Sequence, residues 1–249
     1  MVPNMALVKE FCEEEGIISR AIDKRGNLLE IKYNGKPYFF TYTTTPFNTE
    51  DVQHVCNDKF LTYELLHSKI SLPKTNKYLR PDLDPNWHDA IEFKSVAEIA
   101  ADIQKHFSFP YILKMNAGSL GRNVFVCKNE SDSAKAIEKI FKEDWTLLAQ
   151  ELVEKEKEFR VMIVGNSIEL AYPKGSGEFL EDLREMKKFL APIAGIINLG
   201  WAGLDVILDK SGKYWLVEIN TKPSLISAIK AGQKEKLKPL YKKAFQEIL

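Results

Sequence analysis

Asp205, Glu218 and Asn220 stand in the largely apolar stretch GLDVILDKSGKYWLVEIN, residues 203–220. The turn-forming KSGK divides this stretch into two runs of strand-forming residues, which predicts a β-hairpin. With Asp209 placed opposite Tyr214, counting outward along both strands brings Asp205 opposite Glu218. Side chains alternate between the two faces of a strand, so these two carboxylates are expected on the same face.

The two predicted faces of this hairpin differ in chemistry. Asp205, Glu218 and Asn220 share one face with Ile207 and Leu216. The other face is apolar throughout and holds Leu204, Val206, Leu208, Trp215, Val217 and Ile219. Neighbouring carboxylates repel each other unless a proton or cation lies between them, and oxygen ligands favour a hard ion such as Mg²⁺. The alternative interpretation is a set of solvated polar positions on an ordinary half-exposed hairpin.

A second candidate site follows an apolar strand in FPYILKMNAGSLGRNV. Lys114 ends the strand, and Gly118, Ser119 and Gly121 lie in the turn after it. Backbone N–H groups in such a turn can approach phosphate oxygens, and a lysine beside them supplies a point charge. The order of a Walker A loop, GxxxxGK[ST], is absent. A plain Gly-rich hairpin turn is the alternative.

Two weaker signals lie elsewhere in the chain. Lys59 stands on a predicted helix rich in apolar positions, where a lysine can also simply extend to solvent. Glu158, in the charged run EKEKE, can accept hydrogen bonds from ribose hydroxyls. The apolar strand end before that run can pair its backbone with an adenine edge, and it consists of Gln150, Glu151, Leu152 and Val153. A plain strand followed by a solvated loop is the alternative.

The composition is that of an ordinary globular protein, with 249 residues, 45% hydrophobic and 28% charged. Lys plus Arg equals Asp plus Glu at 35 each, so the net charge does not indicate a partner such as nucleic acid or a membrane surface. No apolar run reaches the ~18 residues of a membrane span, and the N-terminus lacks signal-peptide order. We therefore expect a cytoplasmic protein. Three cysteines without CxxC spacing predict buried thiols rather than disulfides or a zinc site.

Helical and strand patterns are mixed along the chain without strict βαβ alternation, which favours an α+β fold. Strands are expected in three short segments before residue 50, on both sides of the Gly-rich turn, in residues 145–154 and 158–173, and in the hairpin. Helices are expected in residues 5–15, 52–69, 95–107, 131–141 and 179–197 and from about Pro239, with Ser95 and Glu98 forming a capping box.

The order of these motifs resembles the ATP-grasp superfamily of carboxylate–amine ligases over about residues 51–228. The likeness is strongest to glutamate-adding ligases of a ribosomal protein, cyanophycin synthetase and the ligase half of bifunctional glutathione synthetases. It implies two α+β subdomains, 51–152 and 153–249, with ATP between them, after an abbreviated N-terminal region, 1–50. D-alanine:D-alanine ligases are similar around the hairpin.

The resemblance also implies roles for the candidate residues. Lys59 and Lys114 would contact the phosphates, the loop containing Gly118, Ser119 and Gly121 would close over them, and Glu158 would bind ribose. Asp205, Glu218 and Asn220 would hold Mg²⁺. The adenine and its surroundings would be contacted by Gln150, Glu151, Leu152, Val153 and Ile207.

The sequence departs from the family pattern at the acceptor side. D-alanine ligases have an arginine two residues before the metal-binding Asp, where this chain has Gly203. The glutamate-ligase branch takes its arginine from an earlier strand, where Lys174 is the nearest match, and Arg160 fits a basic position of that branch. The catalytic candidates are accordingly Arg160, Lys174, Lys222 and Ser224.

We therefore expect an ATP- and Mg²⁺-dependent ligase that joins an amino acid or peptide-like carboxylate to an amine through an acyl phosphate. A nucleotide-binding protein without turnover, acting within a larger assembly, is the competing hypothesis, and an α+β interaction module is a third. The partner expected is a small-molecule substrate, with no nucleic acid and no membrane. A homo-oligomer, or a partner that supplies the missing N-terminal domain, is left open.

Overall fold

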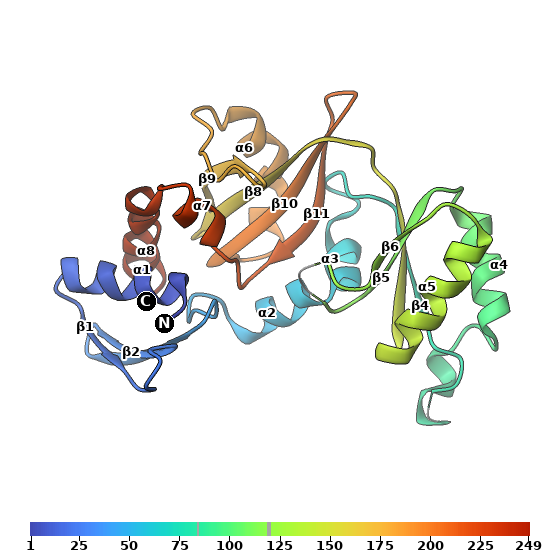
Figure 1. Cartoon of the computed structure of the whole chain (residues 1–249), viewed down its shortest axis with the longest axis horizontal. Coiled ribbons are helices and arrows are strands. Elements are labelled where there is room, and N and C mark those ends of the chain that lie inside the picture. Colours follow the sequence, from blue (N-terminus) through green and yellow to red (C-terminus); the bar gives the residue numbers. More distant parts are fainter. Residues whose placement is uncertain (84, 119–120) are drawn as a thin grey trace. The chain divides into compact units, whose positions relative to one another are not determined.

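The computed structural model describes residues 1–83, 85–118 and 121–249 (Figure 1). The chain divides into two compact units, one of Asn57–Glu154 and the other of Met1–Cys56 with Lys155–Leu249. Both units combine helices with antiparallel sheets, so the expected α+β class is confirmed. The division into 1–50, 51–152 and 153–249 stays a prediction, and the contacts group the first 56 residues with the C-terminal half.

The unit Asn57–Glu154 is built on an antiparallel sheet of strand order β4-β7-β5-β6. Its elements are α3 (Lys59–Leu66), β4 (Thr75–Leu79), the 3₁₀ turn η1 (Pro85–Ala90), α4 (Val96–His106), β5 (Tyr111–Met115), β6 (Val124–Cys127), α5 (Glu130–Glu143) and β7 (Thr146–Glu151). Ile99 and Ile103 of α4 and Ile137 and Ile140 of α5 bury their side chains in one core cluster with residues of the sheet. Strand β4, before the expected linker, was not predicted from the sequence.

Helix starts in this unit follow the local capping chemistry. Ser95 accepts a hydrogen bond from the backbone N–H of Glu98, which confirms Ser95 as the predicted helix cap. The reciprocal bond differs from a capping box, because the Glu98 carboxylate accepts from Lys94 N rather than from Ser95 N. The single helix expected over residues 52–69 is wrong. The chain forms α2 (Glu50–Asn57) and α3, because Asp58 leaves helical geometry and its side chain caps the second helix through Leu61 N.

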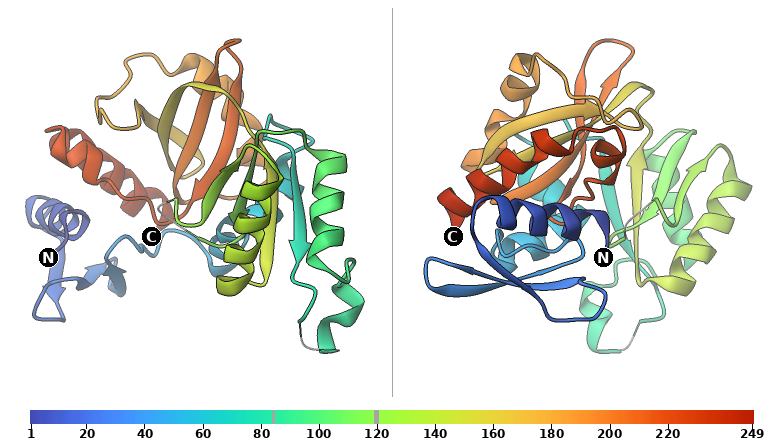
Figure 2. Two further views of the ribbon diagram at one scale, coloured as in Figure 1. Left: turned by 45° about the vertical axis from the view of Figure 1, so that its right-hand side comes forward. Right: turned by 60° about the vertical axis from the view of Figure 1, so that its left-hand side comes forward.

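The other unit contains two sheets among the described residues, ordered β1-β2-β3 and β11-β10-β8-β9 (Figure 2). Its elements are α1 (Pro3–Glu14), β1 (Ile18–Ala21), β2 (Leu28–Tyr33), β3 (Lys36–Thr41), α2, β8 (Lys155–Val164), β9 (Ser167–Pro173), α6 (Arg184–Leu190), η2 (Ala191–Gly195), β10 (Trp201–Asp209), β11 (Tyr214–Asn220), α7 (Ile226–Lys230) and α8 (Lys234–Ile248). Phe11, Phe40 and Phe245 bury their rings in the shared core. The N-terminal segment therefore packs against α8.

The helix expected over residues 179–197 is shorter than predicted. Leu180 N donates to Ala171 O, which keeps residue 180 beside β9, and α6 begins only at Arg184. Pro192 then lies in the 3₁₀ segment that follows. The cysteines are free and buried, as predicted. Within the part of the chain that the structure describes, no helix has the length and apolarity of a membrane span.

The β10–β11 hairpin confirms the predicted pairing of Asp205 with Glu218, although its turn differs. Asp209 N donates to Lys213 O and the Asp209 carboxylate accepts from Ser211 N, so Leu208 rather than Asp209 lies opposite Tyr214. A register shift between Asp205 and Val206 compensates for this difference.

The same shift corrects the predicted faces of β11. Leu216, expected on the polar face, pairs with Val206 and is fully buried, whereas Trp215 and Val217 are only half-buried. The predicted apolar face is therefore correct for Leu204 and Val206 of β10. It is wrong for residues 215–217 of β11, which lie on the turn side of the register shift.

Candidate functional site

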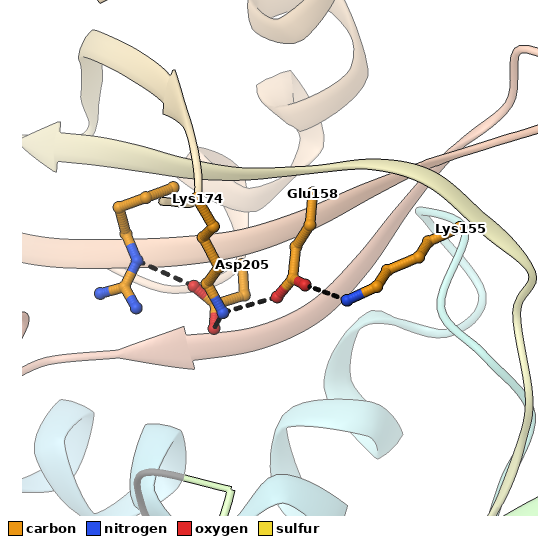
Figure 3. A network of polar contacts seen from close by, with 5 residues as sticks. Lys155, Glu158, Lys174 and Asp205 are labelled. Atoms are coloured by element: carbon orange, nitrogen blue, oxygen red, sulfur yellow. Dashed lines mark hydrogen bonds and ion pairs between the residues drawn. The ribbon is translucent and has the colours of Figure 1, made fainter. Parts of the chain in front are cut away.

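A charged cluster surrounds Asp205 on the sheet of β8, β9, β10 and β11 (Figure 3). Strand β10 pairs with both β11 and β8, which brings Glu218 and Arg160 opposite Asp205 on its two sides. Asp205 is 6% exposed. Its Oδ2 lies 2.6 Å from Lys174 Nζ, and its Oδ1 lies 2.8 Å from Arg160 Nε. Two cations therefore offset the charge of one buried carboxylate.

Lys174 extends the cluster to Glu158. Its Nζ donates to Glu158 Oε1 at 2.6 Å, while Lys155 Nζ donates to Glu158 Oε2 at 2.8 Å. Burial raises the pKa of the Glu158 carboxyl, but the hydrogen bonds from Lys155 and Lys174 outweigh it and leave the pKa below its usual value. Burial likewise lowers the pKa of Lys174, and the nearby Asp205 and Glu158 carboxylates raise it above its usual value. The shifts of Glu158 and Lys174 therefore both favour the charged forms of these two groups.

The contact between Arg160 Nε and Asp205 Oδ1 is an ion pair that lacks hydrogen-bond directionality. Both atoms are buried, and within the described residues neither has a hydrogen-bond partner. Asp205 Oδ1 therefore keeps lone pairs that no hydrogen bond among the described residues uses, although the Arg160 guanidinium offsets its charge. The oxygen-rich set of Asp205, Glu218 and Asn220 fits Mg²⁺ in this respect. Among the described residues, no group of three or more His, Cys, Asp or Glu side chains gathers closely enough to hold a metal ion.

Arg160 also explains why glycine stands at position 203. A Cβ built on Gly203 would lie 2.7 Å from Pro223 Cβ and 2.9 Å from Arg160 Nη1. Such distances are shorter than any ordinary carbon contact. The Arg160 guanidinium, which extends from β8, therefore lies in the space that a side chain at position 203 would fill.

The remaining acceptor-side candidates lie in the loop after β11. Lys222 and Ser224 are both exposed, and the Ser224 hydroxyl accepts from Ile226 N at 3.4 Å. Asn4 of α1 holds this loop, because its side chain donates to Pro223 O and accepts from Leu225 N. Sequence reasoning missed Asn4, since a lone asparagine in the first turn of a helix carries no spacing signal.

In the unit Asn57–Glu154, Lys114 and Gln150 contact each other. Lys114 is 6% exposed, and its Nζ donates to Gln150 Oε1 at 2.8 Å. Gln150 Nε2 in turn donates to Thr75 Oγ1 at 2.8 Å. Gln150 was singled out for its backbone, but its side chain makes the contact with the predicted phosphate-binding lysine. Thr75 was missed because β4 was not predicted.

Lys59 lies against the start of the Gly-rich turn. Its Nζ donates to Gly118 O at 2.9 Å, and Phe60 N donates to the Asn116 side chain at 3.0 Å. The exposed Gly121 has a φ of +68°, a conformation that favours glycine. Ser119 lies outside the described residues. The structure thus brings Lys59 of α3 together with the turn that follows Lys114.

The expected adenine segment leaves the sheet at its second residue. Strand β7 ends at Glu151, whose N–H donates to Lys74 O, and Leu152 and Val153 follow as half-buried residues outside the strand. Ile207 is half-buried on β10, opposite Glu158 of β8. The Glu151 N–H is therefore already used, which leaves the backbone of the next two residues as the better candidate for adenine.

Comparison with solved structures shows that this chain shares its fold with several ligases. The D-alanine–D-alanine ligase from Coxiella burnetii aligns with a TM-score of 0.61 and 16% identity over 79% of this chain and 57% of that one. The VanG D-Ala:D-Ser ligase from Enterococcus faecalis aligns with a TM-score of 0.61 and 15% identity, over 78% of this chain and 62% of that one. The ATP-grasp ligase PsnB aligns with a TM-score of 0.55 and 17% identity, over 80% of this chain and 61% of that one. Its structure was solved in complex with a phosphomimetic variant of a minimal precursor, Mg and ADP. The chain thus spans about three fifths of these ligases.

Sequence comparison gives a Mycoplasma pneumoniae relative named "Uncharacterized protein MG012 homolog", 23% identical over 177 residues, which are 65% of this chain and 60% of the relative. Residues 56–234 match the model of the RimK-like ATP-grasp domain. This range agrees with the resemblance stated from the motifs. Because the match covers more than half of the sequence, the chain belongs to the RimK-like ATP-grasp family.

Proposed function

We propose that this protein is an ATP- and Mg²⁺-dependent ligase that forms an amide or peptide bond between an amino acid or peptide-like carboxylate and an amine. Membership of the RimK-like ATP-grasp family supports ATP-dependent ligation as the type of reaction. The observation that carries the proposal is the buried Asp205, opposite Glu218 and contacted by Arg160 and Lys174. Such charged groups are costly to bury and cluster at functional sites.

The chain offers separate groups for each part of the nucleotide. Lys59 and Lys114 are proposed to bind the phosphates, with backbone N–H groups of the loop from Gly118 to Gly121. Glu158 is assigned to ribose. The base is assigned to the segment after β7 and to Ile207, that is, Gln150, Glu151, Leu152, Val153 and Ile207.

The metal set is Asp205, Glu218 and Asn220, whose oxygens would hold Mg²⁺. When bound, Mg²⁺ offsets the negative charge of the phosphates during phosphoryl transfer. Lys174 now occupies Asp205 Oδ2, so we propose that this ammonium withdraws from Asp205 when a cation binds there.

The chemistry proposed is activation of a carboxylate followed by attack of an amine. Hydroxide is a poor leaving group, whereas transfer of the γ-phosphoryl group to the carboxylate gives an acyl phosphate that releases phosphate. Attack by the amine creates an oxyanion, which needs a fixed positive charge or N–H donor. Arg160 is the first candidate because its side chain is only 15% exposed and is ion-paired with Asp205, followed by Lys174, Lys222 and the backbone of Ser224.

A second candidate function is nucleotide binding without independent turnover, within a larger assembly. The observation that favours it is Gly203, which stands where D-alanine ligases have an arginine. The chain spans 57% and 62% of two ligases with the same fold. A homo-oligomer or a partner protein would then contribute to acceptor binding.

The deciding experiment is an ADP-release screen with amino acids and short peptides in pairs, followed by mass spectrometry of every positive pair. Asp205→Asn serves as the inactive variant, and Glu138→Gln on the exposed face of α5 serves as the matched control. A product whose mass equals the two substrates minus water supports the ligase. ATP binding without ADP release for any pair supports the second function.

A further inference from the structure

A groove of about 750 Å³ runs along β4 in the unit Asn57–Glu154. Strand β4 is the last strand of its sheet, and among the described residues no strand pairs with its outer edge (Figure 2). The groove is lined by residues 75–78 of β4, by one face of α3, by α4 and by residues 92 and 93. Its volume lies within the roughly 300–1,000 Å³ of ligand pockets.

The backbone of β4 presents hydrogen-bonding groups to this groove. Lys74 O accepts from Glu151 N at one end of β4, and Arg80 N donates to Trp145 O at the other, so residues of even number direct their backbone groups toward β7. Backbone direction alternates along a strand. Thr75 and Lys77 therefore direct their N–H and C=O groups outward, into the groove.

Helices α3 and α4 form the two walls of the groove. On the α3 side, Lys77 Nζ lies 4.8 Å from the centre of the Phe60 ring, and the rings of Tyr63 and His67 stack at 4.8 Å. On the α4 side, the Tyr78 hydroxyl donates to Asp102 Oδ2 at 3.0 Å. An extended chain on the open edge would thus contact aromatic side chains on one wall and a carboxylate on the other.

The charge of the groove selects the chemistry of its ligand. Three carboxylates, Glu64, Glu92 and Asp102, line it, against one lysine, Lys77, and two histidines. Of these histidines, His106 lies 3.6 Å from Asp102. Aromatic faces attract ammonium and guanidinium groups and also pack against the aliphatic stems of lysine and arginine. The ammonium of Lys77 above Phe60 shows that this wall accepts a cation.

We propose that the groove is a docking site for an extended, basic peptide segment that adds to β4 as a further strand. Main-chain hydrogen bonds with Thr75 and Lys77 would supply affinity, and the acidic and aromatic walls would select lysine or arginine at alternate positions. None of the lining residues is itself assigned to nucleotide, metal or chemistry. Thr75 contacts Gln150 through its hydroxyl, whereas strand addition would use the Thr75 backbone, so the proposed role does not depend on ligation.

The test uses a fluorescein-labelled, acetylated peptide of alternating lysine and threonine, KTKTKTKT, in anisotropy titrations against the full chain. Tighter binding than that of ETETETET is expected. The Glu64→Lys/Glu92→Lys variant should weaken binding at least tenfold, whereas the matched Glu138→Lys on α5 should leave it unchanged. Equal affinity of the variant and the unaltered chain, or no binding of the basic peptide, overturns the proposal.

A second measurement separates strand addition from simple charge attraction. Hydrogen exchange at the Lys77 amide should slow at least tenfold when the peptide is bound, and a peptide N-methylated at alternate residues should not bind. Binding of the N-methylated peptide, or unchanged exchange at Lys77, overturns strand addition. Circular dichroism and ATP binding of the variants verify their folding, and unchanged ATP binding separates this result from any failure of the ligase proposal.

Discussion

Lys174 Nζ lies 2.6 Å from Asp205 Oδ2 and 2.6 Å from Glu158 Oε1, so a single ammonium bridges the proposed metal-binding and ribose-binding carboxylates. This ammonium and a metal ion would compete for the same oxygen. The first prediction follows from that competition.

Lys174→Met should cost about 1–3 kcal/mol of unfolding free energy, because two charge-assisted hydrogen bonds are lost. The variant should nevertheless show a larger rise in melting temperature on addition of Mg²⁺ alone than the unaltered chain shows. Thermal melts across a Mg²⁺ titration measure both effects. Lys155→Met, which removes a partner of Glu158 and leaves Asp205 paired, is the control. An equal Mg²⁺ response in all three proteins would contradict the competition.

The Asp205–Glu218 pairing could be predicted by counting from a recognisable turn, but the count is right because the register shift between Asp205 and Val206 cancels a one-residue error at the turn. The turn itself, which places Leu208 rather than Asp209 opposite Tyr214, could not be predicted. It depends on the Asp209 side chain, which accepts hydrogen bonds from the backbone N–H groups of Ser211 and Lys213. The Lys174–Asp205 contact was also beyond the sequence, because it requires knowing that β8 lies between β9 and β10. The role of Gln150 beside Lys114 depends in the same way on sheet order. Long-range pairing, rather than local propensity, thus determines the electrostatics of the site.

A second prediction concerns the sign of the charge effect at the hairpin. Sequence alone suggested that Asp205 and Glu218 repel each other, so that neutralising them would stabilise the protein. Asp205 is instead paired with Arg160 and Lys174, and Asp205→Asn should therefore destabilise by about 1–3 kcal/mol. Glu218→Gln should destabilise less than Asp205→Asn does, because Glu218 is the more exposed of the two carboxylates.

Urea denaturation without metal measures this difference. Both substitutions should also remove the rise in unfolding free energy that Mg²⁺ with ATP gives. A ligand stabilises the folded protein only if it binds the folded state, and these variants should bind Mg²⁺ with ATP weakly. Retention of that stabilisation in the double variant would exclude the metal assignment, whatever the stability of the single variants.

Lys114 tests the phosphate assignment. Lys114→Met keeps most of the apolar stem and removes the charge, so ATP binding should weaken by about 1.5–3 kcal/mol, the scale of a charge-assisted hydrogen bond. Isothermal titration with ATP and Mg²⁺ measures the change. Lys135→Met, on the exposed face of α5, should bind ATP normally. If both variants bind equally well, Lys114 has no role in ATP binding, and its contact with Gln150 is structural.

Gly203 tests whether Arg160 takes the place of the missing arginine. Gly203→Ala should destabilise by about 1–3 kcal/mol, because the added methyl would meet Pro223 and Arg160. Arg160→Ala in the same chain should relieve part of this cost, which a double-mutant cycle would report as coupling. Gly195→Ala, which meets nothing within 4 Å, is the matched control. Additive effects at positions 203 and 160 would show that the guanidinium does not require a glycine there.

The reaction proposed for the site predicts a trapped product. An acyl phosphate is attacked by hydroxylamine, so the correct carboxylate should give a hydroxamate while ATP is converted to ADP and phosphate. No covalent enzyme intermediate is expected, because Cys12, Cys56 and Cys127 are buried, and burial raises the pKa of each thiol. Arg160→Lys, which keeps the charge but loses the guanidinium geometry, should lower the rate with the natural amine and leave ATP affinity unchanged. Chromatography of the nucleotides with mass spectrometry of the hydroxamate checks both statements. AMP and pyrophosphate would instead indicate adenylation, and the roles given to Arg160 and Lys174 would then be wrong even if the nucleotide binds tightly.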